Sequence, residues 1–309
     1  EIYTLSLHDA LPILVDPQRN PCHEEGGKLM ERRWLVYPYH LWMLMFTVAP
    51  LALIFYFAFT APGGLGSGGF TLDNIRQAAE PLYLQVLGHS VWLAALATLL
   101  CFFIGYPMAM ILAQCRVKYR NMMVMLIIIP MWMNFLLRTY AWMTLLEKNG
   151  LINAILRFFH LGPLHILYTD GAVLLGMVYN FLPFMILPIY SVLTKMDRSL
   201  LEAAGDLGAD AWTSFRRVTF PLSLPGVYAG MLMVFMPAVT TFVISRLLGG
   251  GQYMLIGNVI EQQFLVIGNW SFGSAVSVLM LALILLSMVF LSRCQPRSEE
   301  RRVGKECRS

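Results

Sequence analysis

The residues whose types and spacing could support chemistry gather in one polar stretch, Ser199–Gly226, within an otherwise hydrophobic second half of the chain. Ser199 and Glu202 have the spacing of a capping box, in which each side chain bonds the other's free backbone N–H, so a helix is predicted to begin there. Asp210 is predicted to cap a second short helix, because a carboxylate is favourable at the positive end of the helix dipole. Gly208 weakens the first helix, so the stretch is predicted to form a compact helix-turn-helix.

Outside this stretch, the sequence shows no set of residues for catalysis or metal binding. The five cysteines form no C-x-x-C pair and have no metal-ligand spacing with histidine, so no zinc site is predicted. No G-x-x-x-x-G-K-[ST] loop is present, and the glycine-rich run Gly63–Gly69 is predicted to be a flexible external loop. We therefore expect a non-catalytic chain that binds no cofactor and does not hydrolyse ATP itself.

The composition indicates a membrane environment. With 58% hydrophobic and 13% charged residues, the chain is far more apolar than a soluble domain, in which about a quarter of the residues are charged. The net charge of +4 is small, so nucleic acid is not an expected partner, whereas membrane lipid is. We interpret the chain as an integral membrane protein.

Six apolar segments are long enough to cross a bilayer core, which requires roughly 20 helical residues. They are residues 41–59, 87–112, 122–146, 172–193, 222–244 and 272–291. The third, fourth and fifth contain internal prolines, among them Pro130, which kink helices and are tolerated where neighbours satisfy the freed carbonyls. An all-α fold with kinked helices lining a pathway is predicted.

Lysine and arginine are divided unevenly between the two sides of these spans. Eleven lie on one side: Lys28, Arg32, Arg33, Arg116, Lys118, Arg120, Lys195, Arg198, Arg216, Arg217 and Arg293. Four lie on the other side: Arg76, Lys148, Arg157 and Arg246. By the positive-inside rule, both termini and Ser199–Gly226 are predicted to be cytoplasmic.

The polar stretch also contains a long spaced motif. Glu202-Ala203-Ala204 is followed by Gly208 and then by Val218-x-Phe220-Pro221. This pattern resembles the EAA loop of ABC importer permeases, and an ordinary amphipathic hairpin is the alternative. The resemblance implies a cytoplasmic coupling helix that docks on an ATPase through Glu202, Ala203, Ala204, Gly208 and Pro221. Leu207 and Trp212 are added as the candidate apolar contacts of this docking surface. Anchoring at the membrane interface is an equal alternative for Trp212.

The resemblance further implies the six-helix bundle of type I importers of the methionine-importer kind, in the inner membrane of a bacterium. The implied partners are a second homologous permease, a dimer of ATPase subunits that bind ATP and Mg, and a periplasmic or extracellular solute-binding protein. ATP binding is then expected to drive alternating access by pulling on the coupling helices.

Two further segments suggest the cargo. Residues 130–142 and 249–273 resemble the spermidine/putrescine branch of these permeases, and the likeness extends over about residues 34–292. It implies import of polyamines. Related permeases for iron or thiamine are one alternative, and an ion-coupled secondary transporter is a less favoured one.

Candidate pathway or gate residues follow from the chemistry of a cationic cargo, which favours carboxylates, aromatic faces and carbonyls. They are Trp132, Asn134, Arg138, Tyr140, Trp142, Asp170, Tyr179, Asn180 and Glu261. Arg138 is the one charge placed within a predicted span, where it either pairs or snorkels structurally or serves as a gate. Packing or an interface belt is the alternative for the aromatic and amide residues.

The two ends of the chain look foreign to the rest. The DNA encoding residues 1–13 can be written so that its reverse complement encodes residues 297–309, as expected of translated sequencing adapter. Residues 14–29 are interpreted as an untranslated leader read as protein, with Met30 as the natural start. The transmembrane domain is accordingly predicted over residues 30–296.

Overall fold

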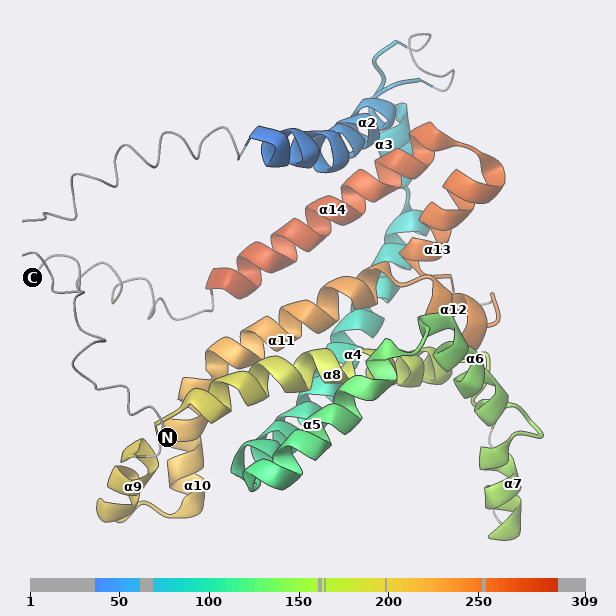
Figure 1. Ribbon diagram of the computed structural model, residues 1–309. Helices are drawn as coiled ribbons and strands as arrows, with labels where there is room; N and C mark the ends of the chain where they lie inside the picture. The colour runs from blue at the N-terminus through green and yellow to red at the C-terminus, as the bar shows by residue number, and fades with distance from the viewer. Residues whose placement is uncertain are drawn as a thin grey trace, which may run out of the picture. The chain divides into compact units, whose positions relative to one another are not determined.

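The computed structural model describes residues 37–61, 69–160, 163, 165–197, 199–251 and 254–293, with side chains as far as residue 289 (Figure 1). These residues form helices and no strand, and a single antiparallel bridge joins Thr60 and Phe70. The foreign-looking ends lie outside the described residues. The chain divides into two compact units, residues 1–53 and 54–309.

The first predicted span is a helix over Tyr37–Ala58. It contains a π-helical turn, η1 (Leu44–Val48), followed by α2 (Ala49–Ala58). Trp42 and Phe46, one turn apart, pack their rings at a centroid distance of 4.2 Å.

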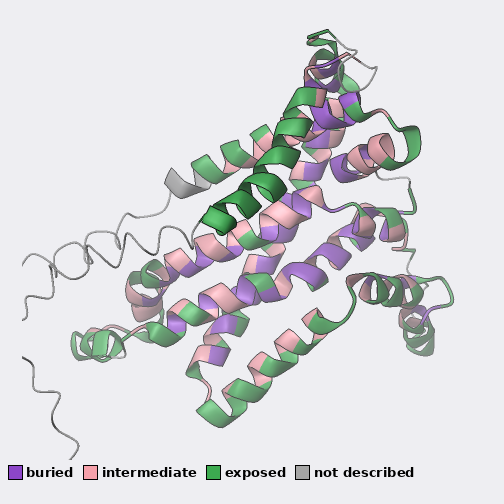
Figure 2. Cartoon of the chain, turned by 45° about the horizontal axis from the view of Figure 1, so that its top comes forward, coloured by how far each residue is buried: buried purple, intermediate pink, exposed green. Residues whose placement is uncertain are grey.

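Three helices form the main core of the second unit: α4 (Pro81–Gln114), α8 (Asp170–Lys195) and α11 (Phe220–Thr240). In Figure 2 the buried residues gather where these helices face one another. Glycines allow the close approach that membrane helices use in place of a hydrophobic driving force. A Cβ on Gly226 would lie 2.9 Å from the carbonyl oxygen of Pro188, and one on Gly230 would lie 2.9 Å from the sulfur of Met185.

The third predicted span differs from the expectation of one helix kinked at Pro130. Helix α5 (Val117–Trp132) continues through Pro130 and ends at Trp132, and α6 (Phe135–Leu146) follows it. The side chain of Asn134 caps α6 by accepting from the backbone N–H of Leu136 at 2.8 Å, which starts a new helix in a new direction. The segment Phe135–Phe158, which includes α6 and α7 (Leu151–Phe158), is bent by 95° relative to α5.

The fifth predicted span begins earlier than expected. Short helix α10 (Ala211–Ser214), the π-helical turn η2 (Phe215–Thr219) and α11 form one continuous helix over Ala211–Thr240. Pro221 lacks the N–H for a normal helical bond, and the π-helical turn directly before it accommodates this loss.

Short elements in the segment between the last two spans cover one end of the core (Figure 1). They are α12 (Val243–Leu248), α13 (Ile256–Glu261) and the π-helical turn η3 (Gln262–Ile267). The last span, α14 (Trp270–Arg293), packs on α3 (Asp73–Ala78) and shares a second buried cluster with α13. In Figure 1, α9 (Ser199–Asp206) and α10 lie at the opposite end of α8 and α11.

Candidate functional site

The polar stretch folds into the predicted helix-turn-helix around Gly208. The N–H of Ala209 donates to the carbonyl of Ala204 at 3.0 Å, and that of Gly208 donates to Gly205 at 2.8 Å. These two bonds form a Schellman motif, in which the glycine adopts the left-handed conformation. Gly208 has φ +78°, and a Cβ there would meet no atom within 4 Å, so backbone conformation alone requires glycine.

The first helix begins at Ser199 as predicted, but its cap is a different residue. The carboxylate of Asp197 accepts the backbone N–H of Ser199 at 3.0 Å, so Ser199 is the first helical residue and not the capping residue. This hydrogen bond holds the pKa of the exposed Asp197 carboxyl below its usual value. The cap is therefore supplied by Asp197, a short polar residue two positions before the predicted capping residue Ser199.

Asp210 occupies the predicted capping position of α10. Its carboxylate accepts from the Thr213 hydroxyl, which is the main reason that the pKa of Asp210 lies below its usual value. Arg216 and Arg217, whose charges would suit a helix C-terminus, lie in η2, inside the continuous helix. Their favourable interaction with a helix dipole is therefore absent, since no helix end is present there.

The predicted docking residues are largely accessible. The side chains of Leu207 and Trp212 are 88% and 67% exposed, which is unusual for large apolar groups outside a lipid environment. Glu202 and Ala203 are exposed beside them on α9, and Pro221 is exposed further along. Ala204 and Gly208 form the turn that holds these side chains outward.

An aromatic chain connects this loop to the core. Trp212 stacks on Phe215 at 5.5 Å, and the Phe215 ring meets Tyr106 of α4 edge-on at 5.8 Å. Phe220 packs on the same tyrosine at 5.8 Å, and the Tyr106 hydroxyl hydrogen-bonds to Ser223 of α11 at 2.8 Å. This aromatic chain was not predicted from the sequence, although the spacing of aromatic residues from Trp212 to Phe220 on one helix was a visible signal.

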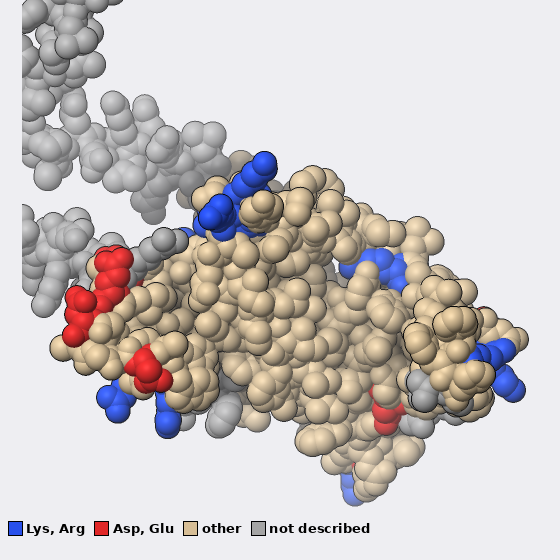
Figure 3. All heavy atoms as spheres, turned by 90° about the horizontal axis from the view of Figure 1, so that it is seen from below, with Lys and Arg blue, Asp and Glu red and all other residues tan. Residues whose placement is uncertain are grey.

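A cavity of about 410 Å³ lies beside the loop and joins the ends of several helices. It is lined by Gln114 of α4, Arg120 of α5, Thr194 of α8 and Glu202 of α9. Arg120 and Glu202 are the charged residues of this lining, so a cation of α5 and an anion of α9 lie at the same cavity. Figure 3 shows one face on which charged side chains lie mostly toward the ends, with a largely uncharged surface between.

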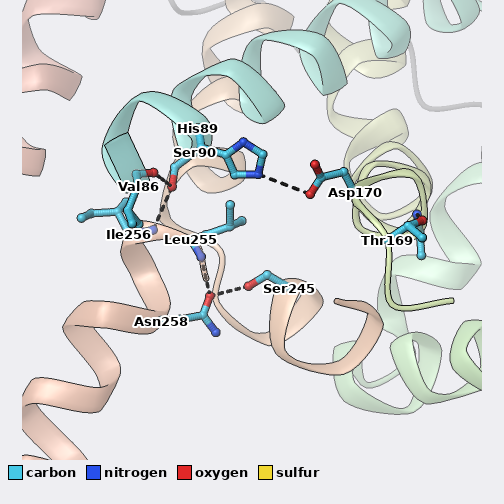
Figure 4. A network of polar contacts seen from close by, with 10 residues as sticks. Val86, His89, Ser90, Thr169, Asp170, Ser245, Leu255, Ile256 and Asn258 are labelled. Atoms are coloured by element: carbon cyan, nitrogen blue, oxygen red, sulfur yellow. Dashed lines mark hydrogen bonds and ion pairs between the residues drawn. The ribbon is translucent and has the colours of Figure 1, made fainter. Parts of the chain in front are cut away.

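The opposite end of the core is tied by polar contacts (Figure 4). His89 of α4 faces Asp170, the first residue of α8, with 3.3 Å between Nε2 and Oδ1. Ser90 accepts the buried backbone N–H of Ile256 at 2.8 Å, which fixes the start of α13 on α4. Asp170, one of the predicted pathway residues, is therefore part of a helix-to-helix contact.

Asn258 makes the hydrogen bonds of this network that lie around α12 and α13. Its side-chain oxygen accepts from the Ser245 hydroxyl and from the Leu255 N–H, and its amide donates to the Phe242 carbonyl at 3.1 Å. These bonds join α12 and α13 and cross the break that follows α11. Glu261, at the end of α13, is paired with Arg246 of α12 at 2.6 Å.

The candidates on α5 and α6 do not form one cluster. Trp132 is exposed at the end of α5, and Tyr140 is exposed on α6. Arg138 is half-buried, with its guanidinium carbon 6.0 Å from the Phe135 ring centroid, a distance at which a cation is attracted by the ring face. Its buried Nε has no hydrogen-bond partner among the described residues.

Two of the remaining candidates meet between α6 and α8, and the third, Asn180, bonds within α8. Trp142 and Tyr179 form an edge-to-face ring pair with centroids 5.2 Å apart. Asn180 is buried and donates to the Gly176 carbonyl at 2.8 Å, while its side-chain oxygen has no partner among the described residues. The pathway roles of all these residues stay predictions.

The comparisons with known proteins agree with this architecture. Residues 105–300 match the family of the binding-protein-dependent transport system inner membrane component. The chain belongs to this family. It is 41% identical over 241 residues to the spermidine/putrescine transport system permease protein PotB of Haemophilus influenzae, covering 77% of this chain and 84% of that protein. PotB of Escherichia coli strain K12 is 42% identical over 241 residues, covering 77% of this chain and 88% of that protein.

A solved structure has the same fold. The crystal structure of a bacterial alginate ABC transporter, in complex with an alginate pentasaccharide-bound periplasmic protein, contains a chain that matches with a TM-score of 0.72. The match covers 90% of this chain and 98% of that one, at 18% identity. The predicted all-α integral membrane fold is confirmed. Among the described residues it comprises five helices long and apolar enough to span a membrane and one bent pair.

Membership of this family makes the chain a non-catalytic, multi-pass component of an inner-membrane transport system. The family match includes the whole helix-turn-helix, the C-terminal end of α4 from residue 105, and all of α8 and α11. The aromatic chain of Tyr106, Trp212, Phe215 and Phe220 lies within the matched residues. The polar network joins matched residues, such as Asp170 and Ile256, to His89 and Ser90 in the earlier part of α4.

Proposed function

We propose that this chain is a permease subunit of an ATP-driven ABC importer that moves polyamines into the cytoplasm by alternating access. The identity of 41–42% to PotB proteins, whose names specify spermidine and putrescine, supports the cargo. The observation that carries the mechanism is the loop itself, in which a left-handed Gly208 presents the exposed Leu207 and Trp212.

The proposed coupling uses the continuous helix from Ala211 to Thr240. An ATPase that pulls on Leu207 and Trp212 moves α10, and the stacked Phe215 transfers this displacement to Tyr106 and α4. Because α11 is the same helix, its far end moves as well, and the pathway opens to the other side. ATP and Mg are bound by the ATPase in this scheme, and not by this chain.

The complete transporter, as we propose it, contains a second homologous permease, two ATPase subunits and a periplasmic or extracellular binding protein. Both termini and the coupling loop face the cytoplasm, in agreement with the lysine and arginine count and with the meeting of Arg120 and Glu202 at one cavity. A cysteine at Leu207 should react with a membrane-impermeant maleimide in inside-out vesicles and stay unlabelled in intact spheroplasts.

The test of function is ATP-dependent putrescine uptake by the reconstituted transporter, with two matched glycine variants. Gly205→Ala and Gly208→Ala each add one methyl group where nothing lies within 4 Å, but only Gly208 has a positive φ. We expect Gly205→Ala to retain uptake and Gly208→Ala to lose most of it, with normal membrane insertion of both. Equal uptake by the two variants would contradict the role of the loop.

The cargo is tested by the same assay. Uptake of iron or thiamine in place of putrescine would retain the ATP-driven import mechanism and replace the proposed substrate. Uptake by this chain alone, driven by an ion gradient and without ATP, would instead identify a secondary transporter and refute the proposed coupling.

A further inference from the structure

A small cavity of about 200 Å³ lies at the end of the core opposite the coupling loop. It is formed by α12, α13 and η3, and its lining includes Arg246, Met254, Asn258, Glu261, Gln262 and Val266. Arg246 and Glu261 are the charged residues of this lining, and their side chains form an ion pair across it at 2.6 Å. The cavity therefore has one anion, one cation and apolar walls.

The two partners of this ion pair are held very differently. The Glu261 side chain is 16% exposed, whereas that of Arg246 is 61% exposed. Glu261 lies where α13 passes directly into η3, so its backbone is fixed on both sides. The carboxylate is thus a stationary part of the wall, while the guanidinium is at the end of a long, solvated side chain.

Such a pair is readily exchanged for another cation. Solvent screening of the exposed Arg246 and the ordering of its long side chain offset part of its attraction to Glu261, which reduces its advantage over a competing cation. A primary ammonium group offers three N–H donors on a compact charge. The Glu261 carboxylate and the Gln262 amide oxygen are acceptors for it, and Met254 and Val266 provide contact for an alkyl chain.

We propose that this cavity is a binding subsite for one primary ammonium group of the cargo and that Arg246 occupies it as a replaceable counter-ion. The proposal rests on the proposed function, and it adds the place where an ammonium group of the cargo binds and the side chain, Arg246, that competes with it. Arrival of the ammonium releases Arg246 from Glu261 and so removes a contact between α12 and α13. The Asn258 hydrogen bonds still join these helices, so the exchange loosens the end of the core without unfolding it.

The test is charge-selective labelling of a cysteine placed at the cavity. Val266→Cys, in the full transporter with the other cysteines replaced, is treated with a cationic and an anionic methanethiosulfonate reagent of similar size. Removing the resident cation with Arg246→Gln should raise the ratio of cationic to anionic labelling rates severalfold, and putrescine should slow the cationic reaction. Arg76→Gln, which removes a charge on α3 outside this cavity, is the matched control and should leave the ratio unchanged.

The carboxylate is tested by the double variant. In Arg246→Gln with Glu261→Gln, the preference for the cationic reagent and the protection by putrescine should both disappear. An unchanged ratio in Arg246→Gln, or protection that persists without Glu261, would overturn the subsite. Charge-selective labelling in a transporter that does not take up putrescine would retain an ammonium subsite and refute the proposed cargo, so the two failures are distinguishable.

Discussion

The two ends of the α4–α8–α11 core are held by different kinds of contact. At the coupling loop, the stacked rings of Trp212, Phe215 and Tyr106 link exposed residues to the core. At the opposite end, hydrogen bonds such as His89–Asp170 and the ion pair of Arg246 with Glu261 join the helices. Ring packing depends on shape and area and tolerates small displacements, whereas each polar contact is made or broken as a unit. The coupling-loop end is therefore suited to transmitting movement, and the polar end is suited to switching between discrete arrangements of its helices.

The core that connects the two ends should be the most sensitive part. A Cβ at Gly226 would lie 2.9 Å from the Pro188 carbonyl oxygen and 3.1 Å from the Ile189 Cα, which are backbone atoms that cannot rotate away. Gly226→Ala is therefore expected to destabilise the protein by about 1–3 kcal/mol, the usual cost of overpacking. Thermal unfolding in detergent measures it.

Gly88 supplies the control for this prediction. It lies inside α4, and a Cβ there meets nothing within 4 Å. Gly88→Ala should be neutral or stabilising by up to about 1 kcal/mol, because alanine favours the helix more than glycine does. Equal destabilisation by both variants would mean that α8 and α11 do not pack through Gly226.

At the coupling end, Phe215→Ala should uncouple ATP hydrolysis from transport. It removes the ring contacts with Trp212 and Tyr106, each worth about 0.5–1.5 kcal/mol beyond the area that they bury. We expect ATPase activity to persist while putrescine transported per ATP falls severalfold. Phe158→Ala, at an exposed phenylalanine of α7, should leave this ratio unchanged, and an equal loss in both variants would exclude a specific role for Phe215.

At the polar end, Ser90→Ala leaves the buried N–H of Ile256 without its acceptor. A buried donor that loses its partner costs about 1–3 kcal/mol. Amide exchange of α13 should accelerate, while that of the coupling loop stays as it was. Ser277→Ala, which removes a bond within α14 alone, is the control, and faster exchange at both ends of the core would contradict their independence.

Acid should have the smallest effect, and only on the coupling loop. The pKa of Asp210 is lowered from 3.8 by its hydrogen bonds, so its stabilisation of α10 is present above that value and is lost as the pH falls through the lower, folded value. At neutral pH no dependence is expected from this group. The fluorescence of Trp212, obtained by subtracting a Trp212→Phe variant, should change only in strong acid, and a change near pH 7 would require another titrating group.

Local patterns in the sequence were sufficient for the coupling loop. The spacing of Ser199, Gly208 and Asp210 predicted the start of α9, the turn and the residue that precedes α10, because capping positions and left-handed turns depend on residues close in sequence. The first cap was assigned two residues late, since Asp197 satisfies the same requirement. The break at Asn134 was missed because Pro130, the more conspicuous signal, is accommodated inside α5.

Contacts between distant helices could not be predicted in this way. Tyr106 and Ser223 lie 117 positions apart, and Ser90 and Ile256 lie 166 apart. In a membrane span nearly every position is apolar, so the hydrophobic pattern does not reveal which face of a helix meets which neighbour. The pairing of Glu261 with Arg246 was missed for a different reason, because these residues lie in short elements between spans and the sequence does not show how those elements fold onto each other.

Photo-crosslinking tests the central claim most directly, that the exposed residues of the loop dock on an ATPase. A benzophenone amino acid replaces Leu207, or Leu265 of η3 at the other end, which are 88% and 77% exposed. In the reconstituted transporter, the probe at position 207 should crosslink to the ATPase subunit, with a yield that depends on ATP, and the probe at 265 should not. Crosslinking to the ATPase from position 265, or none from 207, would contradict the account.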